Sequence, residues 1–266
     1  MNNEQYINRR ITIRVSSESL AIAIPDSNDR TKGSFFKYIS KSGISVAANL
    51  RDAFKTVELL KEPVTNAKVL IDSPTLLIPL DEYKESDNET LYMHSFPSTE
   101  GSIVLSNVLP DLNAVALFAV NRDLKLVIED HYENVRYLHL MQPVWDYLHR
   151  RSFLGNRRKL YAYFHDEALE IFSFERNHFI FFNRFNARSL KDMTYFILFV
   201  WKQLALDQLH DELFLVGAIP DKENLLKALR IYVQMVAVIG TSASFNNAPL
   251  TQEKGITFDM ITALLA

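Results

Sequence analysis

The sequence predicts an α/β protein of two related halves, with mixed sheets and flanking helices. In the first half, apolar residues alternate over 11–15 and again over 20–24, which indicates a hairpin, and an aromatic run at 35–39 adds a third strand. A helix is predicted to begin at Ser45, whose hydroxyl can cap it, and residues 68–71 are typical of a buried strand. The first half is therefore expected to form three strands, a helix and a strand.

The same order of elements returns in the second half. Strands are predicted at 159–164, 168–174 and 178–185, followed by a helix over 189–206 and a strand at 213–216. The helix follows the first strand at a similar distance in both halves. Matching order at similar spacing predicts an internal duplication.

The joint between the halves is a polar turn over 151–156 that contains one glycine. It predicts an N-terminal lobe of residues 1–152 and a C-terminal lobe of residues 153–266. Each half then extends differently. Further helices are predicted at 81–94, 121–131, 143–150 and 221–232, and further strands at 103–109, 114–120, 135–140 and 236–239.

Composition excludes several classes of protein. The chain has no cysteine, so disulfides, thiolate zinc sites and cysteine nucleophiles are excluded, and a net charge of -3 gives no field that would recruit nucleic acid or an anionic membrane. The N-terminus lacks the apolar core of a secretory signal, and the longest apolar run, 195–201, is too short for a bilayer of roughly 30 Å. We therefore expect a cytoplasmic protein without a membrane span.

Catalytic motifs are also missing. The sequence contains no Gly-x-Gly-x-x-Gly, no Gly-Lys-Ser/Thr and no Gly-x-Ser-x-Gly, and no two of its seven histidines are four residues apart. A ribonuclease-H-like nuclease would need an acid in its first strand, where residues 11–15 offer only Arg14 as a charged group. A triad dispersed along the chain stays open. We assign no catalytic residue and no metal ligand.

Three strands as a meander, a helix and a strand, repeated after a linker, resemble the actin-like ATPase superfamily, which includes sugar kinases, the Hsp70 ATPase domain and the pilus protein PilM. The chain is similar to a small bacterial family of uncharacterised proteins assigned to that superfamily, on the stretch 159–220 and the closing Phe258-Asp259-Met260. The resemblance covers nearly the whole chain in its order of elements. It implies two duplicated ribonuclease-H-like lobes with mixed sheets.

The resemblance also implies where a nucleotide would bind. Actin-like ATPases place an Asp and then a Gly in the first hairpin turn of each half, because a carboxylate holds hydrated Mg²⁺ while backbone amides approach the phosphates. Here the first turn offers Ser16 and Ser17 without aspartate or glycine, and the second keeps Asp166 without glycine. Of the paired glycines that contact adenosine, Gly217 is present. If a nucleotide site is retained, these four residues form it.

The missing groups favour a non-catalytic binding or scaffold module with a degenerate nucleotide pocket, no cofactor and a protein partner of unknown identity. One alternative is a working ATPase or kinase that uses ATP and Mg²⁺. Another is a nucleic-acid accessory protein that uses the basic segment 149–159, although the acidic whole makes this segment more typical of a solvated linker.

Two apolar segments admit two interpretations each. The helix over 189–206 is apolar nearly all round, which favours burial between the lobes over a side that faces a partner. The tail over 258–265 is expected to dock on the core, the alternative being a hook for a membrane or a partner.

Overall fold

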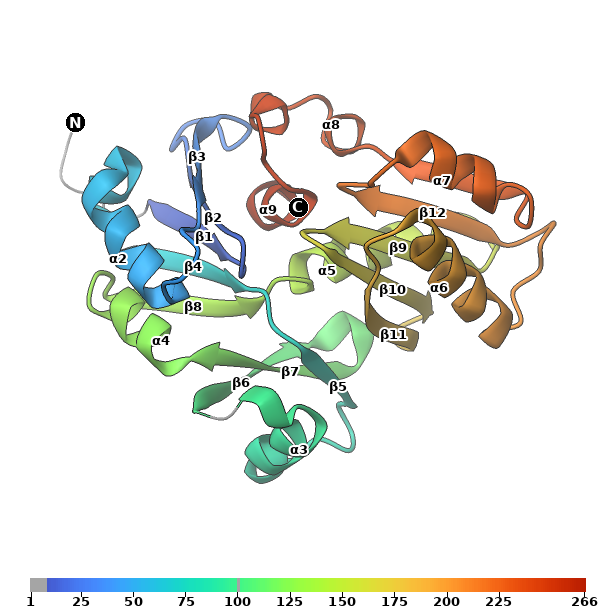
Figure 1. Cartoon of the computed structure of the whole chain (residues 1–266), viewed down its shortest axis with the longest axis horizontal. Helices are drawn as coiled ribbons and strands as arrows, with labels where there is room; N and C mark the ends of the chain where they lie inside the picture. Colours follow the sequence, from blue (N-terminus) through green and yellow to red (C-terminus); the bar gives the residue numbers. More distant parts are fainter. Residues whose placement is uncertain (1–8, 100) are drawn as a thin grey trace. The chain divides into compact units, whose positions relative to one another are not determined.

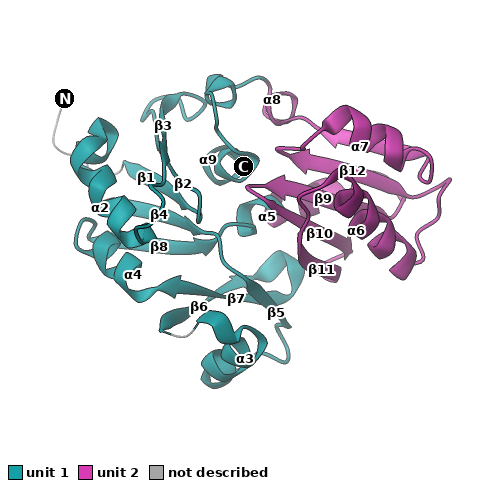
Figure 2. Cartoon of the chain, in the orientation of Figure 1, with its two compact units in different colours: residues 1–144, 247–266 teal, residues 145–246 magenta. Residues whose placement is uncertain are grey.

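The computed structural model describes residues 9–99 and 101–266, and the chain divides into two compact units (Figures 1 and 2). Unit 1 comprises the residues up to 144 together with 247–266, and unit 2 comprises residues 145–246. These units differ from the predicted lobes, 1–152 and 153–266, in where they place residues 145–152 and the closing segment 247–266. Every helix of the described residues is too short or too polar to cross a membrane.

Five strands of unit 1 form a mixed sheet in the order β3-β2-β1-β4-β8. The first three are antiparallel neighbours, and β1, β4 and β8 run parallel. Helices α2 and α4 cover one face of this sheet (Figure 1). The bounds are β1 (Arg10–Val15), β2 (Ser19–Pro25), β3 (Gly33–Ile39), β4 (Asn66–Ile71), β8 (Asn134–His139), α2 (Val46–Thr56) and α4 (Arg122–Glu129).

The sheet of unit 2 has the same plan, in the order β11-β10-β9-β12-β13, with the same alternation of antiparallel and parallel neighbours. Helices α6 and α7 cover one of its faces. The bounds are β9 (Lys159–His165), β10 (Ala168–Glu175), β11 (His178–Asn186), β12 (Glu212–Gly217), β13 (Met235–Ile239), α6 (Leu190–Gln203) and α7 (Lys222–Leu229). Identical strand order and direction confirm the duplicated α/β architecture predicted from the sequence.

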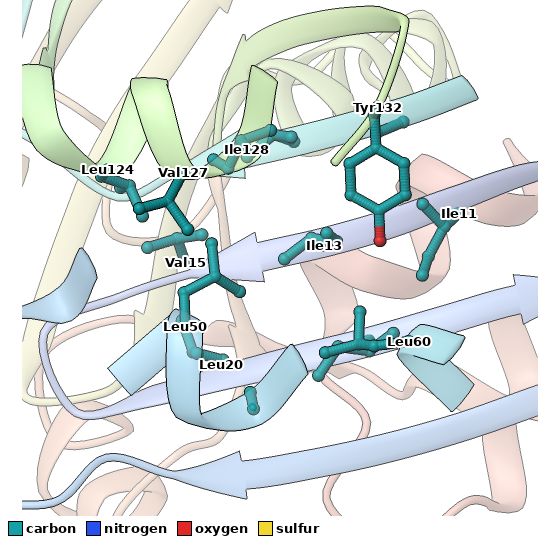
Figure 3. Packing of buried hydrophobic residues seen from close by; sticks show 14 of the residues in the cluster. Ile11, Ile13, Val15, Leu20, Leu50, Leu60, Leu124, Val127, Ile128 and Tyr132 are labelled. Carbon is teal, nitrogen blue, oxygen red and sulfur yellow. The ribbon is translucent and has the colours of Figure 1, made fainter. Parts of the chain in front are cut away.

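Alternation along β1 decides which face of the unit 1 sheet is apolar. Ile11, Ile13 and Val15 point to one face, where Leu50 of α2 and Leu124 of α4 pack with them (Figure 3). None of the five is more than 4% exposed. A slip of one residue would turn the intervening polar residues of β1 into this core, so the apolar pattern fixes the register of the strand.

A second, three-stranded sheet in unit 1 has the order β5-β7-β6. The predicted strands at 103–109 and 114–120 are its β6 (Ser102–Leu109) and β7 (Ala114–Asn121). The third member, β5 (Thr75–Pro79), was not predicted, because a run this short between two prolines has no clear period. The predicted helix over 81–94 is shorter, since α3 (Asn88–Ser95) begins only after a polar turn.

Helix α6 begins where the sequence predicts. The hydroxyl of Ser189 accepts a hydrogen bond from the backbone N–H of Asp192, whose carboxylate accepts one from the N–H of Ser189. This reciprocal capping box satisfies two amides that have no partner within the helix. Met193, Ile197, Val200 and Trp201 are buried.

The outer side of α6 is aromatic and exposed. Tyr195 and Phe199 are 61% and 43% exposed, and their rings stack with centroids 5.9 Å apart. They lie one turn apart on the helix, opposite the residues that enter the core. Burial on all sides, the interpretation favoured from the sequence, is therefore not what the structure shows.

The closing helix α9 (Phe258–Leu265) packs on the second face of the unit 1 sheet, as predicted for a tail that docks on the core. Met260 and Leu264 pack there with Ala21 and Ala23 of β2. The small side chains of these alanines let the helix approach the strands closely. Because α9 follows the strands of unit 2 in the chain, unit 1 is completed by residues from the far end of the sequence.

A buried ion pair fixes α9 to β1. The Nε of Arg14 donates to both carboxylate oxygens of Asp259, at 3.0 and 3.1 Å, and the two side chains are 1% and 0% exposed. The hydroxyl of Thr257 donates to the same carboxylate. Arg14, the charged residue that the sequence placed in the first strand, is thus the anchor of the last helix.

Replacing Asp259 with alanine should destabilise the protein by about 3–5 kcal/mol, because it leaves the Arg14 guanidinium buried without its counter-ion. Urea denaturation measures the loss. The control is Glu129→Ala, which breaks the exposed pair with Lys125 and should cost under about 1 kcal/mol. The double variant Arg14→Met/Asp259→Leu should recover much of the loss, and equal costs for the two single variants would contradict the role given to the pair.

Candidate functional site

The hairpin turns that the resemblance singles out occupy equivalent positions in the two units. In unit 2, His165 pairs with Ala168, which leaves Asp166 and Glu167 at the tip of the turn. In unit 1, the N–H of Ser16 donates to the carbonyl of Ser19, which leaves two residues at the tip in the same way. Ser17 in unit 1 therefore has the place that Asp166 has in unit 2.

The parallel strand beside each turn supports this equivalence. The carbonyl of Val15, just before the first turn, accepts from the N–H of Asp72 after β4. The carbonyl of Phe164, just before the second turn, accepts from the N–H of Ala218 after β12. The two turns thus follow matching positions in matching sheets, and the aspartate is present in one of them.

The first turn is closed by its own side chain. The hydroxyl of Ser16 donates to the carbonyl of Ser19 at 3.1 Å and accepts from the N–H of Ser19 at 3.2 Å. Ser16 is 2% exposed, whereas Ser17 is exposed. The hydroxyl that a phosphate or hydrated magnesium ion would need from Ser16 is already used to hold the hairpin together.

The second turn has the backbone shape of a glycine turn without a glycine. Asp166 has φ = 47°, in the left-handed region, which aspartate tolerates better than most side chains. The turn therefore has a left-handed residue although it lacks the glycine that actin-like ATPases place there. The carboxylate of Asp166 lies 3.3 Å from Nδ1 of His165.

A buried polar cluster lies behind this turn. Nε2 of His165 is 3.3 Å from Oε1 of Glu170, and both residues are 1% exposed. Nη1 of Arg184 lies 3.6 Å from the same oxygen, and the ring of Tyr163 stacks on His165. The strand register places these groups side by side, since Glu170 pairs with Tyr163 on one side and with Arg184 on the other.

The cluster was not found from the sequence. Its signal was Glu170, a charged residue of β10 between Leu169 and Ile171 and on the face opposite them. Imidazole and carboxylate are groups that can bind a metal or transfer a proton. Here His165 and Arg184 both lie beside Oε1 of Glu170, while Oε2 of the same carboxylate is buried without a hydrogen-bond partner among the described residues.

Gly217 has a structural reason to be glycine. Its φ is 88°, and a β-carbon at this position would collide with the carbonyl oxygen of Phe164 and lie 2.7 Å from Cε2 of Tyr163. The space that a side chain at 217 would need is therefore occupied by β9. Glycine lets the end of β12 pack closely against β9, and a ligand could not approach the backbone from this side.

The basic segment 149–159 contacts acidic residues of unit 2. Arg158 pairs with Asp211 at 2.8 Å, and Lys159, which is 5% exposed, lies 3.8 Å from Glu212. Nε2 of His149 lies 2.7 Å from the carbonyl of Arg176. These contacts tie the segment to its own sheet.

The two hairpin turns differ in the groups that they offer to a magnesium-bound triphosphate. A ligand of this kind needs carboxylate oxygens for the metal and open backbone amides for the phosphates. Unit 2 offers Asp166, but unit 1 has Ser17 at the equivalent position, and Ser16 is used within its own turn. The residues present do not match the arrangement that the resemblance implies.

Comparison with known proteins gives the family and the fold. The family model described as a protein of unknown function, DUF3822, matches residues 1–236, and the chain belongs to that family. A search of curated proteins finds no significant match.

Two solved structures are similar over nearly their full lengths. A crystal structure of a Bacteroides thetaiotaomicron protein with actin-like ATPase fold and unknown function has 27% identity and a TM-score of 0.86, covering 100% of this chain and 99% of its own. The PilM–PilN type IV pilus biogenesis complex has 9% identity and a TM-score of 0.62, covering 96% and 97%. The chain has the actin-like ATPase fold predicted from the sequence.

Gly217→Ala should destabilise the protein by about 3 kcal/mol or more, because it adds a collision with β9 to the strain of a left-handed backbone. Gly155→Ala is the matched control: Gly155 has φ = 82°, and nothing lies within 4 Å of its added β-carbon. That variant should cost about 1 kcal/mol. Similar losses in urea denaturation would show that packing against Phe164 is not the reason for glycine at 217.

Proposed function

We propose that this member of the DUF3822 family is a non-catalytic binding or scaffold module, in which the actin-like ATPase fold has lost the means to hold a nucleotide. The observation that carries the proposal is the first hairpin turn. The hydroxyl of Ser16 forms the hydrogen bonds that close this turn, and Ser17 occupies the position that Asp166 has in the other unit. A fold can keep its architecture while its ancestral site decays, because the core and the site depend on different residues.

Charge supports the same conclusion. A triphosphate with its metal needs positive and metal-binding groups that face it from the loops around it. The acidic residue of the first turn, Glu18, lies one position beyond Ser17, where unit 2 has Glu167. Glu167 itself forms an ion pair with Arg188 at 2.7 Å, so this carboxylate of the second turn is neutralised by a neighbouring side chain.

The outer side of α6 supports a role in protein binding. Tyr195 and Phe199 form a stacked, exposed aromatic pair on a helix whose other side is in the core. Aromatic side chains are enriched where proteins bind one another, because they bury much area with few rotatable bonds. PilM, which shares the fold, is known from a complex with PilN. We therefore assign to α6 the contact with a partner that offers apolar side chains.

Calorimetric titration with Mg-ATP tests the loss of nucleotide binding. We expect no magnesium-dependent heat of binding from the wild-type chain, and the same titration curve from Asp166→Ala. Micromolar, magnesium-dependent heat that disappears in Asp166→Ala would refute the non-catalytic assignment and favour an ATPase or kinase. Circular dichroism of both proteins controls for folding.

Removing the aromatic pair tests the partner surface. We expect a protein that co-purifies in fixed stoichiometry with the wild-type chain from its native cells to be lost with Tyr195→Ser/Phe199→Ser, because the buried area of both rings is removed. The control, Leu126→Ser, changes another exposed apolar residue, on α4, and should retain the partner. Equal retention by both variants would exclude α6 as the contact.

A further inference from the structure

A cavity of about 400 Å³ lies within unit 1, at the end of the sheet where β1 begins. It is formed by the start of β1, the loop after β2, the middle of β4 and the last turn of α9. Its lining is rich in cations. The lining side chains include Arg9, Arg10, Arg30 and Lys68, with Asp26 as the acidic one.

Few of these cations are neutralised. Arg9 pairs with Glu62 at 2.8 Å, and the carboxylate of Asp26 accepts from the N–H groups of Asn28 and Asp29 in its own loop. For the part of the chain spanning 9–99 and 101–266, no carboxylate forms an ion pair with Arg10, Arg30 or Lys68. The cavity therefore carries an excess of positive charge.

Strand pairing adds one more cation next to the cavity. Lys68 of β4 is directly opposite Arg136 of β8, and on its other side it pairs with Thr12 of β1. Like charges on directly paired residues destabilise a sheet. Arg136 is exposed, so water screens part of this repulsion, but the pairing adds positive charge beside the cavity without adding a counter-ion.

The positive charges around the cavity act on the pKa of Lys68. Burial, followed by the charges of Arg10, Arg136 and Arg30, lowers its pKa from 10.5 to about 8. Its ammonium donates to the carbonyl of Ala263 in α9 at 2.6 Å. An ammonium has three donors, so this bond leaves two for another acceptor.

We propose that this basic cavity binds a small phosphorylated molecule and holds its phosphate groups between Arg10, Arg30 and Lys68. Guanidinium groups present paired N–H donors that match phosphate oxygens, and an ammonium adds a compact charge. The volume is that of a pocket for a small molecule. No metal is needed, because the protein itself supplies the positive charge.

The basic cavity is separate from the hairpin turns. Within unit 1, the Ser16 turn follows the end of β1, whereas the cavity lies where β1 begins. Binding here therefore does not depend on Asp166 or on magnesium. This difference lets one experiment distinguish the cavity from a nucleotide site at the turns.

The test uses inorganic pyrophosphate with the full chain, freed of divalent metals by a chelating resin. We expect pyrophosphate to raise the midpoint of thermal unfolding more than sodium chloride of equal ionic strength, and to give heat in calorimetry. Arg10→Ala and Arg30→Ala should each weaken binding about tenfold, the usual worth of a charge-assisted hydrogen bond. Arg51→Ala, an exposed arginine on α2, and Asp166→Ala should bind as the wild type does.

The variant Lys68→Met tests whether weaker pyrophosphate binding could come from loss of folding. It removes a partly buried charge beside three arginines, so it should fold at least as stably as the wild type and yet bind pyrophosphate more weakly. A pyrophosphate effect no larger than that of salt, or one unchanged in Arg10→Ala, Arg30→Ala and Lys68→Met, would overturn the proposal.

A pH series gives a readout that packing alone would not produce. Lys68 is charged below its pKa of about 8 and neutral above it, so wild-type affinity should fall between pH 7 and 9 beyond any change in the ligand. The other charged groups that face it, Arg10, Arg30 and Arg136, stay charged. The residual binding of Lys68→Met should lack this component, and identical pH profiles would count against the assignment.

Discussion

The ion pair between Arg14 and Asp259 is the constraint on which the arrangement of unit 1 depends. Two charges removed from water cost several kcal/mol each, and they are tolerated only with the close, multiple contacts seen here. Misplacing α9 by one turn would separate the two buried charges from each other. The pair therefore specifies where the helix lies on the sheet, while Ala21 and Ala23 supply the space for it.

This constraint makes unit 1 discontinuous in the sequence. Arg14 and Asp259 are separated by 245 positions, and all of unit 2 lies between them in the chain. A contact between residues so far apart in sequence closes a long loop. The entropic cost of closing the loop grows only slowly with its length, but contacts of this kind slow folding. The sheet of unit 1 can assemble its α2 and α4 face early, whereas its second face waits for the last residues of the chain. Completion of unit 1 is thereby tied to the residues that follow unit 2 in the chain.

Local patterns predicted most of the fold, and the rest came from contacts that no local pattern contains. Alternation in β1 and the capping serine of α6 gave strand and helix correctly, because burial on one face and an unsatisfied helix end are local problems. The partner of Arg14 could not be predicted, since any of many carboxylates could have met it. The left-handed conformation of Asp166 does not follow from the sequence either, because Asn and Asp adopt positive φ at some turns and not at others. Seven described residues other than glycine adopt a positive φ, and five of them are Asn or Asp, such as Asn113 and Asp221.

Two cations on the α9 face of the unit 1 sheet have different surroundings, and we assign them different roles. Arg14 receives a carboxylate and becomes part of the core. Lys68, one strand away on the same face, has a backbone carbonyl as its hydrogen-bond acceptor among the described residues, and Arg136 lies beside it. Stability alone would favour an apolar residue at 68, as it does at Leu70 two positions later. A cation held at a cost in an open cavity is better explained by a charge that comes from outside the chain. The face that anchors the last helix thus also carries the cations of the basic cavity.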